Sequence, residues 1–448
     1  MKKTMMALSA ATLLVTGAAG CGNADNNKAA NSENAATSSN AAANNGAASN
    51  EEFTLRIAMG SPGEKLIAVW NEIKDMYEEK YPNVTVDLNF QDDDMYQTIG
   101  LPNLLNSDNA PDIYFEWAGQ RLKMREEEGF AADLTEALQQ DGLKDRFVES
   151  DFNGMSVDGK TYMIPSNADV TNVIWYNKEI FDELKLTPPK TWDEFVAVSN
   201  KVKEAGITPI AVGNKDLWAG GNWMAHIISR VVGEQAYADA LTMKKPFNSP
   251  EFVKALNYIK VMRDNEFVNK SAVAIADNEA DTLFMNGQAA MHPIGSWFVS
   301  TAMEEAPDFE YDFFNLPSMP DGAGDQSSVL GVATGYMINK KTEHLQAAID
   351  FMKMYVSPEV SAKLLENGVT PMAKGAVDPS KTDALTVKLN DLLKNASALV
   401  SPPDTGYNLE IADALNTATS QVLSGSNTPE KALAEIDSKI AHLKAEQK

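Results

Sequence analysis

The chain has 448 residues, a formal net charge of −25 at pH 7 and a single cysteine, which excludes an intramolecular disulfide. Its acidity argues against nucleic acid as a partner and against direct binding of the folded body to anionic lipid, because phosphate groups would be repelled. Beyond a short apolar run at the N-terminus, no stretch approaches 18 uninterrupted apolar residues, so the sequence predicts no membrane-spanning helix.

The first 20 residues have the three parts of a secretory signal. Two lysines precede an apolar run from Met5 to Val15, and small residues follow it. The run is shorter than the roughly 20 apolar residues that span a bilayer, which favours cleavage over insertion. Residues 18–21, Ala-Ala-Gly-Cys, resemble the lipobox of bacterial lipoproteins. This resemblance implies that residues 1–20 are removed and that Cys21 carries a lipid. The alternative is an ordinary signal peptide cut near an incidental cysteine.

A polar segment follows the cysteine. Residues 22–51 contain no aromatic and no large aliphatic side chain. Such a segment cannot bury enough apolar surface to offset its chain entropy. We therefore predict a disordered tether over residues 21–51, which would anchor the body to the cell membrane through the lipid on Cys21 only.

The folded body begins near residue 52 with alternating strand and helix patterns. Short apolar runs predict strands at 53–59, 84–90 and 111–118, and helical periodicity predicts a helix over 64–80. Strands separated by helical stretches are typical of parallel βαβ units. The sequence therefore predicts an α/β fold, with two or three domains on length.

The same pattern continues along the chain. Thr191 followed three residues later by Glu194 predicts a capped helix that ends near Gly206, and a strand is predicted over 208–213. The C-terminal region reads as mostly helical, with breaks in the stretches Ser-Pro-Pro-Asp-Thr-Gly-Tyr and Ser-Gly-Ser-Asn-Thr-Pro-Glu.

Five stretches between about residues 53 and 370 resemble, in order, successive blocks of a known family. They are PDIYFEWAGQRL, MIPSNADVTNVIWYNKEIF, TWDEFVAVSNKVKEAGITPIAVG, LFMNGQAAMHPIGSWFVS and GYMINKKTEHLQAAIDFMKMYVSPE. The family is the extracellular solute-binding proteins of ABC importers, in the carbohydrate-binding group related to maltose-binding protein. The resemblance implies a two-lobed clamshell of the periplasmic-binding-protein kind with hinge crossovers. It also implies an extracytoplasmic monomer that binds a carbohydrate between its lobes and delivers it to ABC transporter permease subunits.

The resemblance also implies how each lobe is assembled. By block position, lobe 1 contains residues 52–166 and 318–356, and lobe 2 contains residues 167–317 and 357–448. The chain would cross between the lobes near Pro165 to Thr171, near Asn315 to Pro320 and near Val356 to Glu359. Extended segments suit crossovers, because small changes in a few backbone dihedrals there rotate whole lobes.

A sugar presents flat C–H faces and a rim of hydroxyls, so its site needs aromatic platforms and planar polar side chains. Trp117 ends a predicted strand, and Trp297 follows Ile-Gly-Ser at a predicted turn from strand to helix. Ligands of open α/β sheets bind outside the carboxyl ends of strands. We therefore predict that Trp117 and Trp297 are opposing platforms, and the resemblance supports Trp297 as a stacking residue.

The other tryptophans divide into two groups. Trp218, and less clearly Trp223, lie in a glycine-containing loop that opens a helix, where an aromatic either faces the cleft or folds back as a plug. Trp70, Trp175 and Trp192 lie in amphipathic or wholly apolar stretches, so we predict that they are core residues.

The polar candidates come from the same loops. Glu116 and Gln120 flank Trp117, and the resemblance places hydroxyl-binding groups near Asn167 and Asp169. Asp92 and Asp93 read more readily as a solvated turn than as ligand groups. The predicted polar site residues are Glu116, Gln120, Asn167, Asp169 and Asn222. The resemblance also implies an aromatic site residue in the helix break near the C-terminus, which is Tyr407.

The sequence offers no pattern for catalysis. It contains no G-x-S-x-G, H-E-x-x-H, P-loop or G-x-G-x-x-G motif, and its four histidines lack metal-ligand spacing. A glycosidase needs two carboxyl groups about 5–10 Å apart, and nothing singles out such a pair. We therefore expect no enzyme, no cofactor and no metal. Two alternatives stay open: a binder of a non-sugar solute such as a peptide or a polyamine, and a surface hydrolase.

Overall fold

The computed structural model describes residues 51–446, except for the side chain of Asp94. The predicted signal peptide, Cys21 and almost all of the predicted tether lie outside these residues.

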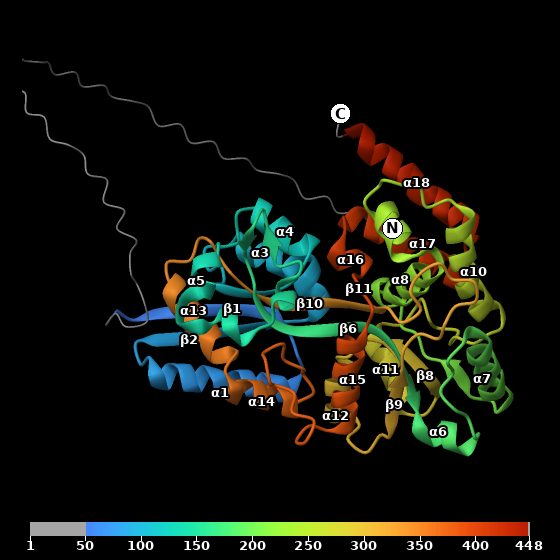
Figure 1. Cartoon of the computed structure of the whole chain (residues 1–448), viewed down its shortest axis with the longest axis horizontal. Helices are drawn as coiled ribbons and strands as arrows, with labels where there is room; N and C mark the ends of the chain where they lie inside the picture. The colour runs from blue at the N-terminus through green and yellow to red at the C-terminus, as the bar shows by residue number, and fades with distance from the viewer. Residues whose placement is uncertain (1–50, 447–448) are drawn as a thin grey trace, which may run out of the picture. The chain divides into compact units, whose positions relative to one another are not determined.

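The described strands form a mixed nine-stranded sheet and a separate two-stranded ribbon. The order along the large sheet is β2-β1-β3-β10-β6-β8-β7, with β11 paired to β10 and β9 paired to β6 (Figure 1). The strands are β1 Phe53–Gly60, β2 Val84–Gln91, β3 Ile113–Trp117, β4 Ser156–Val157, β5 Lys160–Thr161, β6 Ile164–Asn177, β7 Thr208–Ile210, β8 Ala289–Ile294, β9 Tyr311–Phe314, β10 Val329–Ile338 and β11 Leu399–Val400.

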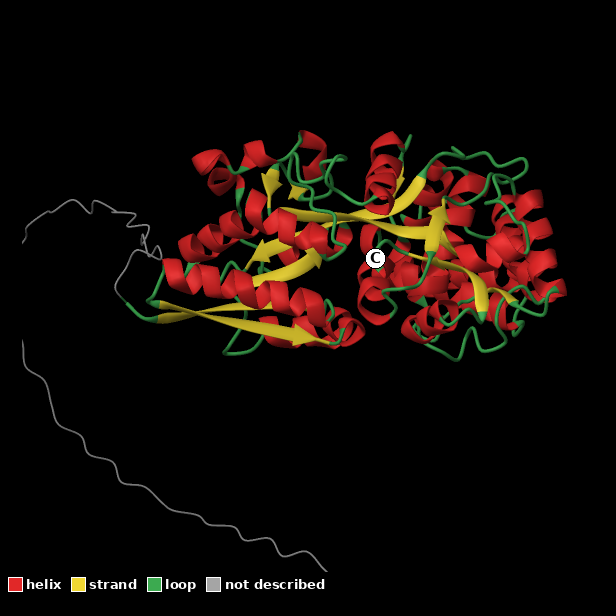
Figure 2. Cartoon of the chain, turned by 90° about the horizontal axis from the view of Figure 1, so that it is seen from below, coloured by secondary structure: helices red, strands yellow, loops and turns green. Residues whose placement is uncertain are grey.

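Helices alternate with the strands throughout the described chain and pack around the large sheet (Figure 2). The α-helices are α1 Glu64–Lys80, α2 Asp93–Met95, α3 Leu101–Leu105, α4 Gln120–Glu127, α5 Thr135–Gln139, α6 Lys178–Glu183, α7 Trp192–Glu204, α8 Trp218–Val232, α9 Glu234–Leu241, α10 Pro250–Asp264, α11 Asp277–Met285, α12 Phe298–Glu305, α13 Leu345–Tyr355, α14 Pro358–Glu366, α15 Ala384–Asn395, α16 Pro403–Gly406, α17 Leu409–Ser424 and α18 Pro429–Glu446. The π-helix η1 covers Tyr96–Gly100, and the 3-10 helices are η2 Gln140–Gly142, η3 Lys144–Arg146 and η4 Glu149–Phe152.

The N-terminal βαβ prediction is confirmed. Strand β1 pairs in parallel with both β2 and β3, and helix α1 connects β1 to β2. Helix α1 has the predicted bounds, because its apolar residues recur at helical spacing and form one buried face: Leu66, Val69, Trp70, Ile73 and Tyr77.

The predicted capping of α7 is also confirmed. The backbone N–H of Glu194 donates to Oγ1 of Thr191 at 3.3 Å, and the N–H of Thr191 donates to Oε2 of Glu194 at 3.3 Å. The following strand β7 is shorter than predicted. Its extension is prevented because the N–H of Val212 donates to the side chain of Asn269 at 2.7 Å instead of to a neighbouring strand.

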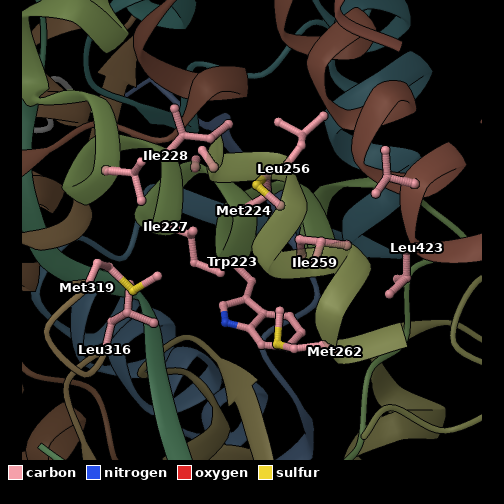
Figure 3. Close-up of a cluster of buried hydrophobic side chains, with 14 of the residues drawn as sticks. Trp223, Met224, Ile227, Ile228, Leu256, Ile259, Met262, Leu316, Met319 and Leu423 are labelled. Atoms are coloured by element: carbon pink, nitrogen blue, oxygen red, sulfur yellow. The ribbon is translucent and has the colours of Figure 1, made fainter. Parts of the chain in front are cut away.

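The buried side chains form three apolar cores, the third of which contains Trp175, Phe284 and Phe298. One core gathers β1, β3, α1 and α13, and a second gathers α8, α10 and α17. Figure 3 shows the second core around Trp223, with Ile259 and Met262 beside the indole. Two strands contribute to both the first and the second core. Strand β6 contributes Ile164 to the first and Ile174 to the second, and β10 contributes Tyr336 to the first and Leu330 to the second.

Near two of the predicted lobe boundaries, the residues that follow the boundary still pack in the core of the residues that precede it. Met319 packs in the second core, although residues 318–356 were predicted in lobe 1. Val360 and Leu364 of α14 pack in the first core, although residues 357–448 were predicted in lobe 2. Side-chain packing passes from the second core to the first along β10, between Leu330 and Tyr336, and the first core extends through Leu364 of α14.

Candidate ligand-binding site

A cavity of about 450 Å³ lies at the carboxyl ends of strands from both halves of the sheet. Small-molecule sites are typically about 300–1,000 Å³, and in open α/β sheets they lie at this end of the strands. Residues just after β1, at the end of β3 and just after β8 line the cavity, together with parts of β6, α8 and the 402–405 segment. The cavity therefore brings together segments that are far apart in the sequence.

Trp117 is the last residue of β3 and lines the cavity. Its ring meets the edge of Phe115 at 4.9 Å between centroids, and the guanidinium of Arg121 lies 5.0 Å from its ring centroid. Arg121 is itself held in place, because its Nε donates to the backbone oxygen of Asp404 at 3.2 Å. Trp117 is thus a half-buried aromatic with a fixed position at the strand end.

Trp218 and Trp297 form an aromatic pair in the same cavity. Trp218 opens α8, Trp297 occupies the N-cap position of α12, and their ring centroids lie 5.7 Å apart at an interplanar angle of 56°. A Cβ at Gly295 would come within 2.1 Å of the Trp297 ring, so this position needs glycine. Both rings also pack against the apolar cluster that contains Phe298 and Val299, to which Trp117 does not belong.

Asp169 supplies a carboxylate beside these rings. Its Oδ1 accepts hydrogen bonds from Nδ2 of Asn167 at 3.0 Å and from Oγ of Ser296 at 3.4 Å. Burial raises the pKa of Asp169 to about 6, and the charge of Asp93 adds to this, while the two hydrogen bonds oppose it. No described group donates to Oδ2 of Asp169, so this oxygen is available to a ligand hydroxyl.

Several buried polar atoms of the lining have no hydrogen-bond partner among the described residues. They are Oγ1 of Thr171, Oδ1 of Asn222, Oδ1 of Asp404 and Oγ1 of Thr405. Buried polar atoms are normally hydrogen-bonded, and leaving one unpaired is costly. A bound molecule with many hydroxyls would satisfy these atoms.

The cavity therefore brings together six of the predicted site residues: Trp117, Asn167, Asp169, Trp218, Asn222 and Trp297. Trp175 and Trp192 are buried core residues, as predicted, and lie outside the lining. Trp223, for which the sequence left a cleft position open, is 1% exposed and also lies outside the lining. Trp70, only 3% exposed, is a core residue that also contributes to the cavity wall.

Three predicted site residues do not line the cavity. Glu116 is fully buried and paired with Nε of Arg125 at 2.8 Å, because successive side chains of a strand point to opposite faces and Trp117 takes the cavity side. Gln120 begins α4 outside the lining. Tyr407 packs into the second core, with its ring edge-on to Tyr237 at 5.7 Å.

Sequence reasoning missed other lining residues. Asp93 lines the cavity, although its stretch was expected to be a solvated turn. The neighbouring Asp92 instead caps α2, because its side chain accepts the backbone N–H of Met95 at 3.0 Å. Asp404 and Thr405 come from the same helix break as Tyr407. The helix break therefore contributes Asp404 and Thr405 to the lining, whereas Tyr407 in the same break does not line the cavity.

One contact joins the two sides of the cavity. The carboxylate of Glu304, near the end of α12, accepts the backbone N–H of Glu64 at 3.1 Å and of Lys65 at 3.4 Å, at the start of α1. The Nζ of Lys65 donates in return to the backbone oxygen of Met303 at 2.5 Å. A carboxylate at a helix N-terminus is favourable, so this contact stabilises the arrangement in which α1 and α12 meet.

Two classes of feature are not found in the described part of the chain. No group of three or more His, Cys, Asp or Glu side chains within residues 51–446 is arranged to hold a metal ion. None of the described helices combines the length and the apolar character needed to cross a bilayer.

Known proteins with similar sequences are solute-binding proteins. A Streptococcus mutans protein named multiple sugar-binding protein is 28% identical over 265 residues, which is 57% of this chain and 61% of that relative, so the match spans less than two thirds of its length. An extracellular-binding protein of an ABC transporter from Pyrococcus horikoshii is 25% identical over 385 residues, 85% of this chain and 81% of that protein. The α-glucosides-binding periplasmic protein of Rhizobium meliloti is 26% identical over 222 residues, 47% of this chain and 48% of that protein.

Solved structures share the fold over most of the chain. One from work on xylan utilization by Caldanaerobius polysaccharolyticus has a TM-score of 0.80 and 26% identity, covering 87% of this chain and 100% of that chain. A chitin oligosaccharide binding protein has a TM-score of 0.79 and 22% identity, covering 87% of this chain and 98% of that chain. The family described as bacterial extracellular solute-binding protein matches residues 60–362. The chain belongs to this family and has its two-lobed α/β fold.

Proposed function

We propose that this protein captures a sugar or oligosaccharide between its two lobes and delivers it to the permease of an ABC transporter. The observation that carries the proposal is the composition of the cavity. Three tryptophan rings from two halves of the sheet meet there with hydroxyl-accepting groups, namely Asp169, Asn222 and Asp404. This combination of flat apolar faces and planar polar groups suits a sugar.

The names of relatives support the same ligand class. Two of them, at 28% and 26% identity, are named for binding sugars and α-glucosides. Membership in a family of substrate-binding proteins supports capture of a ligand over its chemical conversion.

The location and the partners are part of the proposal. A lipid on Cys21 would hold the protein at the outer face of the cell membrane, and the polar stretch up to residue 51 would let the body reach a permease. Stable anchoring needs two or more lipid chains, since a single chain holds only marginally. The protein would act as a monomer.

A cationic solute such as a polyamine is the second candidate, because six carboxylates line the cavity. Calorimetric titration against mono- and oligosaccharides, with spermidine as a further ligand, tests both candidates. We expect binding of at least one sugar, with the sugar recovered intact by chromatography. Binding of spermidine with no response to any sugar would favour the second candidate, and release of shorter sugars would show a hydrolase.

A further inference from the structure

The ring of Trp297 rests on the backbone of Gly295. A Cβ atom placed on Gly295 would lie 2.1 Å from Cζ3, 2.2 Å from Cη2 and 2.5 Å from Cε3 of the Trp297 ring. Carbon atoms in contact stay about 3.5–4.0 Å apart, so the indole occupies the space that any side chain at position 295 would need. The φ of Gly295 lies outside the left-handed region, so alanine could adopt this backbone. The ring, and not the backbone conformation, therefore requires glycine here.

The backbone beneath the ring is held by buried groups. The Nε1 of Trp175 donates to the carbonyl oxygen of Gly295 at 3.2 Å, and Trp175 is 0% exposed. The backbone N–H of Ser296 donates to the backbone oxygen of Val170, in β6, at 2.8 Å. Because these bonds fix the end of β8, a Cβ at Gly295 would displace the ring and not the strand end.

The partner of the ring is also held by its own turn. Trp218 opens α8, and its ring centroid lies 5.7 Å from that of Trp297. The backbone N–H of Trp218 donates to the oxygen of Asp216 at 2.9 Å, across Leu217, whose φ of 70° and ψ of −31° resemble a tight γ-turn. The geometry of the indole pair therefore depends on where the Trp297 ring lies.

We propose that Gly295 is a positioning residue for ligand binding, which lets the Trp297 ring lie on the strand end and pair with Trp218. A methyl group at position 295 would push the ring away by about 1 Å or more, because the closest separation of 2.1 Å must grow to a normal carbon contact. The stacking surface would move with the ring. The inference rests on the proposed function, since it concerns the same cavity, but the position of the ring can be tested without a ligand.

The first test is spectroscopic and uses the ligand-free protein. Two indoles that are close and tilted couple their electronic transitions, which gives a paired signal in circular dichroism. Trp297→Ala removes one indole and so defines the signal by difference. We expect Gly295→Ala to lose most of the same signal, although both indoles are still present.

Gly322→Ala is the matched control for a crowded glycine. A Cβ at Gly322 would come within 2.4 Å of the backbone oxygen of Arg230, and its φ also lies outside the left-handed region. Gly322 is not part of the cavity lining. Its substitution should lower stability, but it should keep both the paired signal and the sugar affinity of the folded protein.

The second test is calorimetry with the sugar that binds most tightly. Gly295→Ala should weaken its binding about tenfold to a hundredfold, as expected when an aromatic platform no longer stacks. In the Trp297→Ala background, the same substitution should change the affinity less than about twofold, because there is no ring left to displace.

Three results would overturn the inference. Gly295→Ala with an unchanged paired signal and affinity would show that the ring does not depend on Gly295. An equal loss of affinity in the Trp297→Ala background would show that the effect does not pass through the ring. If Gly295→Ala does not fold, the double variant with Trp297→Ala decides: folding restored by removal of the ring supports the inference, and continued failure to fold overturns it. Failure of every sugar to bind would reject the proposed function, while the dichroism signal would still show whether Gly295 places the ring.

Discussion

Replacing Trp117 with alanine tests whether the cavity aromatic serves binding and not stability. The indole lines the cavity, and it is not among the side chains that pack against any of the three cores. Stacking of a flat sugar face should be worth about 1–3 kcal/mol, by analogy with base stacking and with burial of an apolar side chain. Trp117→Ala should therefore weaken sugar binding about tenfold to a hundredfold, since 1.4 kcal/mol is one decade.

Trp223→Ala is the matched control. Trp223 is 1% exposed and surrounded by Ile259, Met262 and other side chains of the second core (Figure 3). Its truncation should cost about 3–5 kcal/mol of unfolding free energy, as expected for a large core residue. It should change the affinity of the remaining folded protein little. Calorimetry and chemical unfolding of both variants measure the two effects. The reasoning is refuted if Trp117→Ala lowers stability as much as Trp223→Ala while sugar affinity stays at its original value.

Four further predictions follow from other features. Burial raises the pKa of Asp169 to about 6, from an ordinary value of about 3.9. Between these two pH values the carboxyl group is protonated in the native state and ionised in the unfolded chain. The stability that this proton contributes is therefore lost as pH rises through that window. Asp169→Asn should remove that slope in pH-dependent unfolding, and an unchanged slope would contradict the assignment. Glu304→Ala should weaken sugar binding roughly two- to fivefold by removing the contact with the start of α1, as judged by calorimetry, and an unchanged affinity would deny it a role in closure. Cys21→Ser should leave the protein unlipidated and either release it from the membrane fraction or stall its processing, and a mutant that stays lipidated would reject the lipoprotein proposal. A binding sugar should reduce the radius of gyration in small-angle scattering without dimerisation, because it favours the closed state, and an unchanged profile at saturation would count against a clamshell.

Local patterns predicted the elements well where one physical rule dominated. Helix α1 has the predicted bounds because its apolar spacing and its ends agree with each other, and the capping box fixes the start of α7. The rule that ligands lie at strand carboxyl ends led to Trp117 and Trp297, since each residue is placed there by the strand before it.

The remaining residues depend on contacts between distant parts of the chain. Glu116 is buried because Arg125, on the next helix, completes an ion pair with it, and Tyr407 is withdrawn from the cavity because it packs against Tyr237. The predicted lobe boundaries depend on contacts of the same kind, since β10 pairs with β3 at one end and with β6 along its length. None of these partners can be read from local periodicity.

The central claim is that a sugar binds in the cavity between the two halves of the sheet. The most direct measurement is a crystal structure of the protein with the tightest-binding oligosaccharide from the calorimetric panel. We predict an intact sugar stacked on Trp117 and on the Trp218 and Trp297 pair, with hydroxyls bonded to Asp169, Asn222 and Asp404. A sugar bound elsewhere on the body, with this cavity left without one, would contradict the account.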